Sequence, residues 1–368
     1  MKRILEVFGE PISRGGQESY VMSTLQNMNL TGLKVDLFTP YYCDNNEFVD
    51  FIESIGGTVT HIDLPFIVGG TRREIIPCFK KYLKGNEYDI VHIHSGSTSV
   101  LAHYAKVAST SGVRKVIVHS HSSGVKKNFK HTFIKTYSAR LFKKYATDFC
   151  ASSIEAAEWK FPKKILKKVK ILYNGIDLKK FYYDPVIREK VRKKYGISSN
   201  DLVLGHVGRF TSEKNQIYLV NLLSDFGKSI KDFKLVLVGN GDELYSVQKK
   251  TNELELNDKV LFIGSTDTVN DYMNMFDIFL MPSLYEGLGI VGIEAQATGL
   301  PVIASLGVPQ IMKVTNNVSF INLDDKEQWI DEILKYSSKK RFDNTSSIIS
   351  YGFDIKDTAE DVFNMYNF

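Results

Sequence analysis

One segment combines glycines with two carboxylates at a fixed spacing. Glu286-Gly287-Leu288-Gly289-Ile290 directly follows an apolar, strand-like run, and Glu294 lies eight residues beyond Glu286. A glycine-rich turn that opens a helix presents unpaired backbone N–H groups and the positive end of the helix dipole, which together bind anions. The pattern predicts a helix that runs to about Thr298 and stops at Gly299. Eight residues are close to two helical turns, so both carboxylates are expected on one side, where they suit sugar and ribose hydroxyls. The alternative is that Glu286 is only an acidic residue favoured near a helix N-terminus.

A second segment carries two cations around another turn. Gly208-Arg209 follows the apolar run Val203–Val207, and Lys214 comes five residues after Arg209. Arginine binds phosphate as a two-pronged fork and lysine as a point charge, so the pair could hold a diphosphate at the end of the strand. The alternative is a charged loop that is merely solvated.

Two further groups follow strands nearer the N-terminus. Gly15-Gly16-Gln17-Glu18 comes after the first apolar run, and paired glycines let a backbone approach a phosphate or a sugar closely. His119 and His121 lie at the end of another run, Lys115–His119, where imidazoles are well placed for a ligand. Alternatively, the glycines form a plain strand-to-helix connection and the histidines are structural.

The elements that must position these residues alternate along the chain. Short apolar, β-branched runs are separated by amphipathic stretches of helical length, which is typical of parallel sheets covered on both faces. The predicted strands are Arg3–Phe8, Lys34–Thr39, Val59–Leu64, Asp89–His94, Lys115–His119, Asp148–Ser152, Lys170–Tyr173, Val203–Val207, Lys234–Val238, Val260–Ile263, Ile278–Met281 and Val302–Ala304. We therefore predict an α/β protein with two doubly wound, Rossmann-like parallel-sheet domains.

A polar, lysine-rich stretch without period-2 patterning divides the two sets of strands, near residues 174–200. We place the domains at residues 1–180 and 181–351. The last helix, about 352–368, could belong to either and could pack back on the first domain. Because ligands bind at the carboxyl ends of parallel strands, we expect the active site in the cleft between the domains.

Composition excludes several classes of protein. The 368 residues are 43% hydrophobic and 24% charged, which is ordinary globular usage and neither disordered nor collagen-like. No apolar run is long enough to span a bilayer, and Glu6 interrupts the first one, so we expect no signal peptide. Cys43, Cys78 and Cys150 are scattered and odd in number, which indicates reduced thiols in a cytoplasmic protein.

The charge is uneven along the chain. The formal net charge is +5, too small by itself to indicate nucleic acid binding. Residues 126–170, however, contain 13 lysines and arginines against three acidic residues. Within them, residues 129–145 have apolar positions at helical spacing, punctuated by lysines. Such a basic amphipathic helix suits an anionic membrane surface, although a packed helix with solvated lysines fits the pattern equally well.

Taken in order, these motifs resemble family 4 of the glycosyltransferases, with two facing Rossmann-like domains (the GT-B fold), near its capsular and exopolysaccharide branch. The resemblance covers roughly residues 1–310. It rests most specifically on the Glu286-x7-Glu294 helix together with Gly208-Arg209 and Lys214. A departure is Leu306-Gly307-Val308-Pro309-Gln310, where the family often has a glutamate at the last position.

The resemblance implies a role for each matching residue. Arg209 and Lys214 would clamp the donor diphosphate, Glu286 would contact the donor hexose, Glu294 would bind the ribose, and His121 would lie near the donor sugar. The remaining donor-binding residues would be Gly15, Gly16, His119, Gly208, Gly264, Gly287, Leu288, Gly289 and Ile290. His119 is the alternative to His121, and the backbone near Gly264 would contact the base.

The activity implied is that of a retaining, metal-independent hexosyltransferase. It would use a nucleotide diphosphate sugar, expected to be UDP-linked, and a saccharide acceptor, expected to be lipid-linked, in surface polysaccharide synthesis. No Asp-x-Asp triplet occurs in the chain, in agreement with the absence of a metal cofactor. The location implied is cytoplasmic, with possible peripheral attachment to the inner face of the membrane.

Three other functions are alternatives to a hexosyltransferase. A nicotinamide dehydrogenase needs Gly-x-Gly-x-x-Gly, and Gly239-Asn240-Gly241 lacks the third glycine. A nucleotide-sugar epimerase could share the architecture and would release free sugar product without an acceptor. A non-catalytic partner subunit is a further alternative, although such proteins usually lose donor-site residues that are present here.

Overall fold

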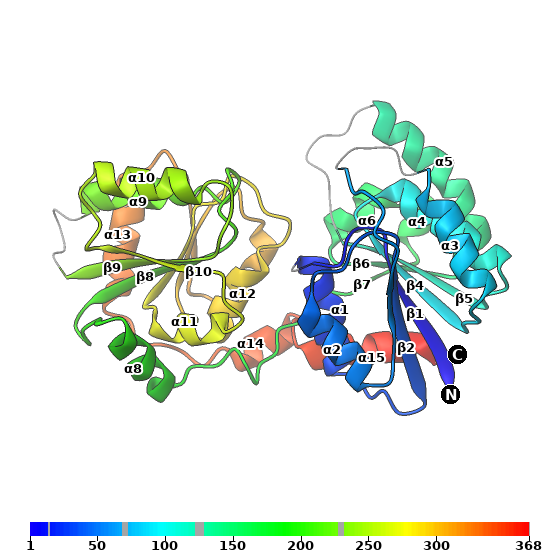
Figure 1. Cartoon of the computed structure of the whole chain (residues 1–368). Coiled ribbons are helices and arrows are strands. Elements are labelled where there is room, and N and C mark those ends of the chain that lie inside the picture. The colour runs from blue at the N-terminus through cyan, green and yellow to red at the C-terminus, as the bar shows by residue number, and fades with distance from the viewer. Residues whose placement is uncertain (14, 68–72, 122–128, 227–231, 368) are drawn as a thin grey trace. The chain divides into compact units, whose positions relative to one another are not determined.

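A computed structural model describes residues 1–13, 15–67, 73–121, 129–226 and 232–367. The described residues form two compact units, one comprising Met1–Gly175 with Ile355–Phe368 and the other Ile176–Asp354. Each unit is a parallel sheet with helices on both faces (Figure 1). The predicted α/β class with two doubly wound parallel sheets is confirmed.

Unit 1 contains a seven-stranded sheet in the order β3-β2-β1-β4-β5-β6-β7. Its strands are β1 (Lys2–Phe8), β2 (Leu33–Thr39), β3 (Val59–His61), β4 (Ile90–Ser95), β5 (Lys115–Ser120), β6 (Asp148–Ala151) and β7 (Val169–Ile171). Its helices are α1 (Gly16–Gln26), α2 (Asn46–Ser54), α3 (Ile75–Lys84), α4 (Thr98–Thr110), α5 (Phe129–Tyr145), α6 (Ile154–Lys160), α7 (Lys163–Leu166) and α15 (Ile355–Tyr366).

Alternating side chains of the unit 1 strands supply two cores. Leu5 and Val7 of β1 pack on the face covered by α3, α4, α5 and α6. Ile4 and Phe8 pack on the opposite face, with α1, α2 and the C-terminal helix α15. The last helix of the chain thus completes the covering of the first sheet (Figure 1).

Unit 2 contains a six-stranded sheet in the order β10-β9-β8-β11-β12-β13. Its strands are β8 (Leu202–Val207), β9 (Phe233–Val238), β10 (Val260–Gly264), β11 (Ile278–Met281), β12 (Val302–Ser305) and β13 (Val318–Ile321). Its helices are α8 (Pro185–Lys194), α9 (Gln216–Phe226), α10 (Leu244–Glu253), α11 (Val269–Met275), α12 (Ile290–Ala297), a 3-10 turn η1 (Gln310–Met312), α13 (Lys326–Ser337) and α14 (Thr345–Ser350). Among the described residues, β13 is the strand that the sequence pattern did not predict.

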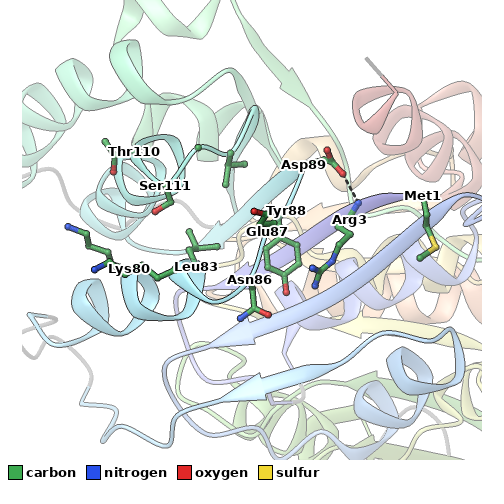
Figure 2. Close-up of a pocket in the computed structure, with 13 residues that line it drawn as sticks. Met1, Arg3, Lys80, Leu83, Asn86, Glu87, Tyr88, Asp89, Thr110 and Ser111 are labelled. Carbon is green, nitrogen blue, oxygen red and sulfur yellow. Dashed lines mark hydrogen bonds between the residues drawn. The ribbon is translucent and has the colours of Figure 1, made fainter.

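One hollow of unit 1 lies away from the predicted site residues. It encloses about 630 Å³ and is lined by residues that include Arg3, Lys80, Tyr88 and Asp89 (Figure 2). Arg3 lies at the start of β1, and Tyr88 and Asp89 lie just before β4, where the parallel strands begin, whereas Lys80 belongs to α3. The predicted site residues His119 and His121 lie where β5 ends, at the opposite ends of the strands of the same sheet.

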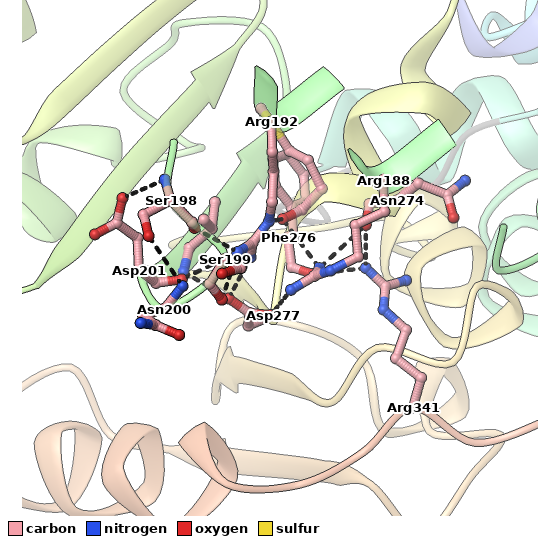
Figure 3. A network of polar contacts seen from close by, with 12 residues as sticks. Arg188, Arg192, Ser198, Ser199, Asn200, Asp201, Asn274, Phe276, Asp277 and Arg341 are labelled. Atoms are coloured by element: carbon pink, nitrogen blue, oxygen red, sulfur yellow. Dashed lines mark hydrogen bonds and ion pairs between the residues drawn. The ribbon is translucent and has the colours of Figure 1, made fainter. Parts of the chain in front are cut away.

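A buried network fixes α8 to the sheet of unit 2. Asp277, just before β11, accepts hydrogen bonds from Arg188 at 2.5 Å and from Arg192 at 2.7 Å (Figure 3). Arg192 also donates to the carbonyl oxygens of Met275, Ser198 and Asp201. A guanidinium that satisfies this many carbonyls holds several backbone segments in one arrangement.

Candidate functional site

The turn between β8 and α9 brings Lys214 over the glycine at the end of the strand. A Cβ atom placed on Gly208 would lie 3.6 and 3.7 Å from Cδ and Cε of Lys214. Asn215, which has a left-handed φ of 55°, donates from Nδ2 to the carbonyl of Pro282 at 3.2 Å. The amide of Leu284 donates to the carbonyl of Glu213 at 2.7 Å. The turn that carries Lys214 is therefore tied to the loop after β11.

Lys214 and Glu286 form an ion pair in the structure. The Nζ atom of Lys214 donates to Oε1 of Glu286 at 2.6 Å, and the side chains are 24% and 10% exposed. Ser283 Oγ donates to the same carboxylate oxygen at 2.8 Å. The backbone amide of Glu286 donates to the carbonyl of Gly307 at 3.2 Å. The structure thus brings two of the predicted site residues into direct contact and holds the glutamate from two directions.

The helix expected after Glu286 begins later than the eight-residue spacing between Glu286 and Glu294 suggested. Gly289 is the residue before α12 and adopts a left-handed φ of 77°, so the helix starts at Ile290. Glu286 therefore lies in the glycine-rich turn before the helix, so helical periodicity does not relate its position to that of Glu294. The amides of residues 287–290 have no hydrogen-bond partner in the part of the chain that the structure describes. They form the expected group of unpaired donors beside the ion pair.

Glu294 is half-buried in α12. Burial raises its pKa to about 7, because the charged form loses hydration. The helix packs closely beneath it: a Cβ on Gly292 would come within 2.7 Å of the sulfur of Met281 and 2.8 Å of that of Met312. A carboxyl group in this position can exchange hydrogen bonds with hydroxyl groups without a cation.

Arg209 is exposed and its guanidinium makes no hydrogen bond or ion pair with the residues that the structure describes. Its backbone carbonyl accepts a hydrogen bond from Gln216 Nε2 at 3.0 Å, which holds the turn. The structure therefore does not place Arg209 in contact with the Lys214–Glu286 pair. Gly264, at the end of β10, has a φ of 78° and accepts from the amide of Gly239 at 2.8 Å.

His206 is a residue that the sequence reasoning missed. It lies in β8, and its Nδ1 atom donates to the carbonyl of Leu280 at 2.8 Å. Its Nε2 atom is buried without a partner and lies 3.2 Å from the position of a Cβ on Gly208. Burial lowers its pKa to about 4, so the ring is neutral at pH 7. The signal was a histidine inside the otherwise apolar run Val203–Val207.

In unit 1, the predicted glycine turn opens α1 as expected. Gly15 precedes the helix with extended backbone, and the amide of Ser19 donates to its carbonyl at 3.0 Å. A Cβ on Gly15 would lie 2.5 Å from Oε2 of Glu18, so the carboxylate of Glu18 folds back over the start of the helix. Burial raises the pKa of Glu18 to about 7. Gly16 is the first residue of α1 and has open space around it.

His119 and His121 belong to a larger cluster of imidazoles. His119 pairs in register with His94 of β4, and its ring stacks on that of His121 at 4.1 Å between centroids. His92, His94 and His119 each offer a nitrogen within 4.8 Å of the others, a spacing that could hold a metal ion. These rings also exchange hydrogen bonds with each other and with Glu6, whereas Nε2 of His119 is buried without a partner.

The basic segment of residues 126–170 divides between core and surface. Residues 126–128 and the side chains of 129–131 lie outside the described residues. In α5, Phe142 is fully buried, whereas Phe133 and Tyr137 are 66% and 51% exposed. Lys160 is buried and bonded to the carbonyl of Gly96. The helix is thus packed against the core along one side and carries exposed aromatic side chains on another, next to exposed cations. The exposed basic residues are Arg140, Lys143, Lys144, Lys163, Lys164, Lys167, Lys168 and Lys170.

The structure describes no helix that is both long and apolar enough to cross a bilayer.

Comparisons with known proteins agree across both units. The family described as Glycosyltransferase Family 4 matches residues 14–180, and the family described as Glycosyl transferases group 1 matches residues 187–352. The putative glycosyltransferase EpsF of Bacillus subtilis is 29% identical, over 100% of this chain and 96% of its own length. The capsular polysaccharide biosynthesis glycosyltransferase CapH of Staphylococcus aureus is 26% identical, over 100% of this chain and 99% of its own.

A solved structure shares the fold. The crystal structure of Anabaena HepE in complex with UDP matches with a TM-score of 0.76 and 20% identity, over 100% of this chain and 99% of that one.

Proposed function

The chain belongs to family 4 of the glycosyltransferases, near its capsular and exopolysaccharide members, and from that premise we propose that it transfers a hexose from a UDP-sugar to a saccharide acceptor. The observation that carries the proposal is the Lys214–Glu286 ion pair beside the unpaired amides of residues 287–290. Permanent positive charge and backbone donors at one point suit a diphosphate, and a carboxylate next to them suits a sugar hydroxyl. The UDP complex of HepE supports the choice of nucleotide.

The proposed chemistry is charge stabilisation at the leaving group. As the bond between the sugar and the diphosphate breaks, negative charge grows on the phosphate oxygens. Lys214 and the amides at the start of α12, which the structure holds in place before the reaction, stabilise that charge together with Arg209. Glu286 accepts a hydrogen bond from the hexose, and its contact with Ser283 keeps the free oxygen oriented. The acceptor hydroxyl attacks from the face that the diphosphate leaves and passes its proton to a departing phosphate oxygen. This retains the anomeric configuration without a metal ion.

Glu294 is proposed to bind the ribose. Its raised pKa means that the carboxyl group is partly protonated at neutral pH, so it can both donate to and accept from hydroxyl groups. Gly15 and Gly16 are proposed to face the diphosphate, His121 the donor sugar with His119 as the alternative, and Gly264 the base. Gly208, Gly287, Leu288, Gly289 and Ile290 complete the proposed donor contacts.

The acceptor is proposed to be a lipid-linked saccharide, in the assembly of a surface polysaccharide. Exposed Phe133 and Tyr137, next to the exposed cations of the basic segment, suit the headgroup layer of an anionic membrane. Flotation with vesicles that contain or lack anionic lipid tests this directly. We expect recovery with anionic vesicles only, weakened in F133S/Y137S. Equal recovery with both vesicle types would refute membrane attachment.

Thermal unfolding with a panel of nucleotide sugars and nucleotides tests the donor. A ligand that binds the folded state raises the midpoint, so UDP and one UDP-sugar should raise it more than the other nucleotides. Transfer is then measured with that sugar in EDTA, where activity should persist, and the anomeric configuration of the product is read by NMR. An inverted product would contradict retention. Formation of an isomeric nucleotide sugar without any acceptor would support the epimerase alternative instead.

A further inference from the structure

A single buried carboxylate lies at the centre of the histidine cluster of unit 1. Glu6 of β1 is 1% exposed and lies beside His92 in the register of β1 and β4. Its Oε2 accepts from Nε2 of His94 at 2.6 Å, and its Oε1 accepts from the hydroxyl of Tyr366 in α15. Burial raises the pKa of this carboxyl group, and the nearby His92 and the hydrogen bond from Tyr366 lower it. In its ionised form the group can only accept, so two chains of hydrogen bonds start from it.

The first chain runs from Glu6 through His94 to His121. The Nε2–H group of His94 donates a hydrogen bond to the carboxylate. In the neutral ring Nδ1 therefore carries a lone pair. That lone pair lies 2.8 Å from Nε2 of His121, which must therefore be the protonated nitrogen of His121. The remaining nitrogen of His121, Nδ1, is left with a lone pair and has no partner among the described residues. His121 is partly exposed at the end of β5.

The second chain runs from Glu6 through Tyr366 and His92 to His119. The hydroxyl group of Tyr366 donates its one hydrogen bond to Glu6. The hydroxyl oxygen must therefore accept a hydrogen bond from Nδ1 of His92, 2.7 Å away. Nε2 of His92 then accepts from Nδ1 of His119 at 3.2 Å. The last atom of the chain, Nε2 of His119, is buried without a partner. Each chain thus ends on a lone pair.

The rings are neutral because burial opposes their charging. Desolvation lowers the pKa of His94 to about 3 and holds the pKa values of His92, His119 and His121 well below their ordinary range. A neutral imidazole carries one proton, so fixing the hydrogen bond at one nitrogen fixes the state of the other.

We propose that Glu6 is a positioning residue that sets the tautomer of His121, so that Nδ1 of His121 presents a lone pair to a hydroxyl group of the substrate. The inference rests on the proposed function in assigning that hydroxyl to the donor sugar. A lone pair accepts from a hydroxyl and is repelled by a phosphate oxygen, which has only lone pairs to offer. His121 therefore recognises the sugar part of the donor and not its diphosphate.

The 15N NMR shift of a histidine nitrogen differs between a nitrogen that carries a proton and one that carries a lone pair. Spectra of the full chain labelled with 15N-histidine therefore test the relay without substrate. We expect the Nε2–H tautomer for His94 and His121 and the Nδ1–H tautomer for His92 and His119, assigned by the peaks that H121N and H119N each remove. An Nδ1–H tautomer at His121 would overturn the proposal. Stoichiometric bound metal that shifts these peaks on chelation would overturn it too, because a coordinated nitrogen cannot take part in the relay.

Two variants separate the chains. Y366F removes the tyrosine proton but leaves Glu6, His94 and His121 in place, so the tautomer of His121 should persist. E6Q replaces a carboxylate that can only accept with an amide that both donates and accepts, so the amide must donate to His94 or to Tyr366, and donation to His94 reverses the chain to His121. We expect E6Q to lower kcat/KM for the donor about tenfold to a hundredfold relative to Y366F when the chain to His121 reverses.

The outcomes distinguish the relay from the proposed function. If the tautomer of His121 in the wild type and in Y366F is not Nε2–H, the relay is wrong whatever the activity. If E6Q reverses the tautomer of His121 while transfer from the donor is unchanged, the relay stands and the assignment of His121 to the donor sugar falls. If E6Q does not fold, the wild-type and Y366F spectra still decide the tautomers.

Discussion

The ion pair between Lys214 and Glu286 gives the sharpest test of the donor site. K214M removes the ammonium group but keeps the methylene chain that packs over Gly208 at 3.6–3.7 Å, so the turn should keep its shape. K214R keeps the charge and is the matched control. Glu286 retains its bond from Ser283 Oγ at 2.8 Å in both variants.

The expected loss in K214M is far greater for catalysis than for stability. Removing one preset donor from a transition state costs on the order of 100- to 1,000-fold in kcat, or about 2.7–4 kcal/mol. The ion pair is partly exposed, with Lys214 at 24%, so its loss should lower the free energy of unfolding by only about 1 kcal/mol. Catalysis and folding should therefore separate clearly in this variant.

The assay measures kcat and KM for the UDP-sugar, together with the unfolding midpoint in urea. K214R should keep a larger share of kcat than K214M, because a charge remains near the diphosphate. A kcat for K214M within threefold of the wild type, with the fold intact, would refute the assignment of Lys214 to the leaving group. A large loss of stability with little loss of kcat per folded molecule would show that the pair is structural.

Three further changes test other parts of unit 2. Burial raises the pKa of Glu294 to about 7, so the folded state binds its proton more tightly than the unfolded state. As pH rises from about 4.5 to 7, the free energy of unfolding of the wild type should therefore fall relative to that of E294Q, by up to about 3 kcal/mol. Urea unfolding at pH 5 and 8 measures this difference. R192M should cost about 2–4 kcal/mol in the same assay, since several buried carbonyls lose their donor, whereas R114M at a 69% exposed side chain should change little. G307A should lower kcat, because its Cβ would lie 2.4 and 2.6 Å from backbone atoms of the loop before Glu286; L306A, at an exposed neighbour, should not.

Most of the fold followed from local pattern. Continuous apolar strands separated by amphipathic helices specify a covered parallel sheet, because such strands are buried on both faces. The strand Val318–Ile321 was not predicted because it is short and its apolar run is interrupted by a serine. It lies at an edge of the sheet. The place of α15 was left open because its contacts are with residues distant in sequence, of which Glu6 and His92 are more than 200 positions away.

The proposed donor-site residues could be named from the sequence where chemistry and spacing coincide in one loop. The contact of Lys214 with Glu286 joins residues 72 positions apart, which sequence alone does not give. His206 and Glu6 were missed for a common reason: each is a polar side chain inside an apolar strand. Its function depends on which neighbours share its face, and that requires the order of strands in the sheet.

In the proposed donor site, the carboxyl ends of the strands of the two units meet opposite electrostatic requirements. A leaving diphosphate gains charge, so groups that meet it must stay charged without titrating, and lysine, arginine and backbone amides do so at neutral pH. A sugar hydroxyl carries no charge, so a cation beside it would only attract competing anions. Burial around Glu6 removes the charge of four imidazoles and leaves hydrogen-bond direction as the one property that can distinguish ligands. A carboxylate at the origin of that network is the group that fixes the direction, because it is the one common side chain that accepts at every lone pair and donates at none.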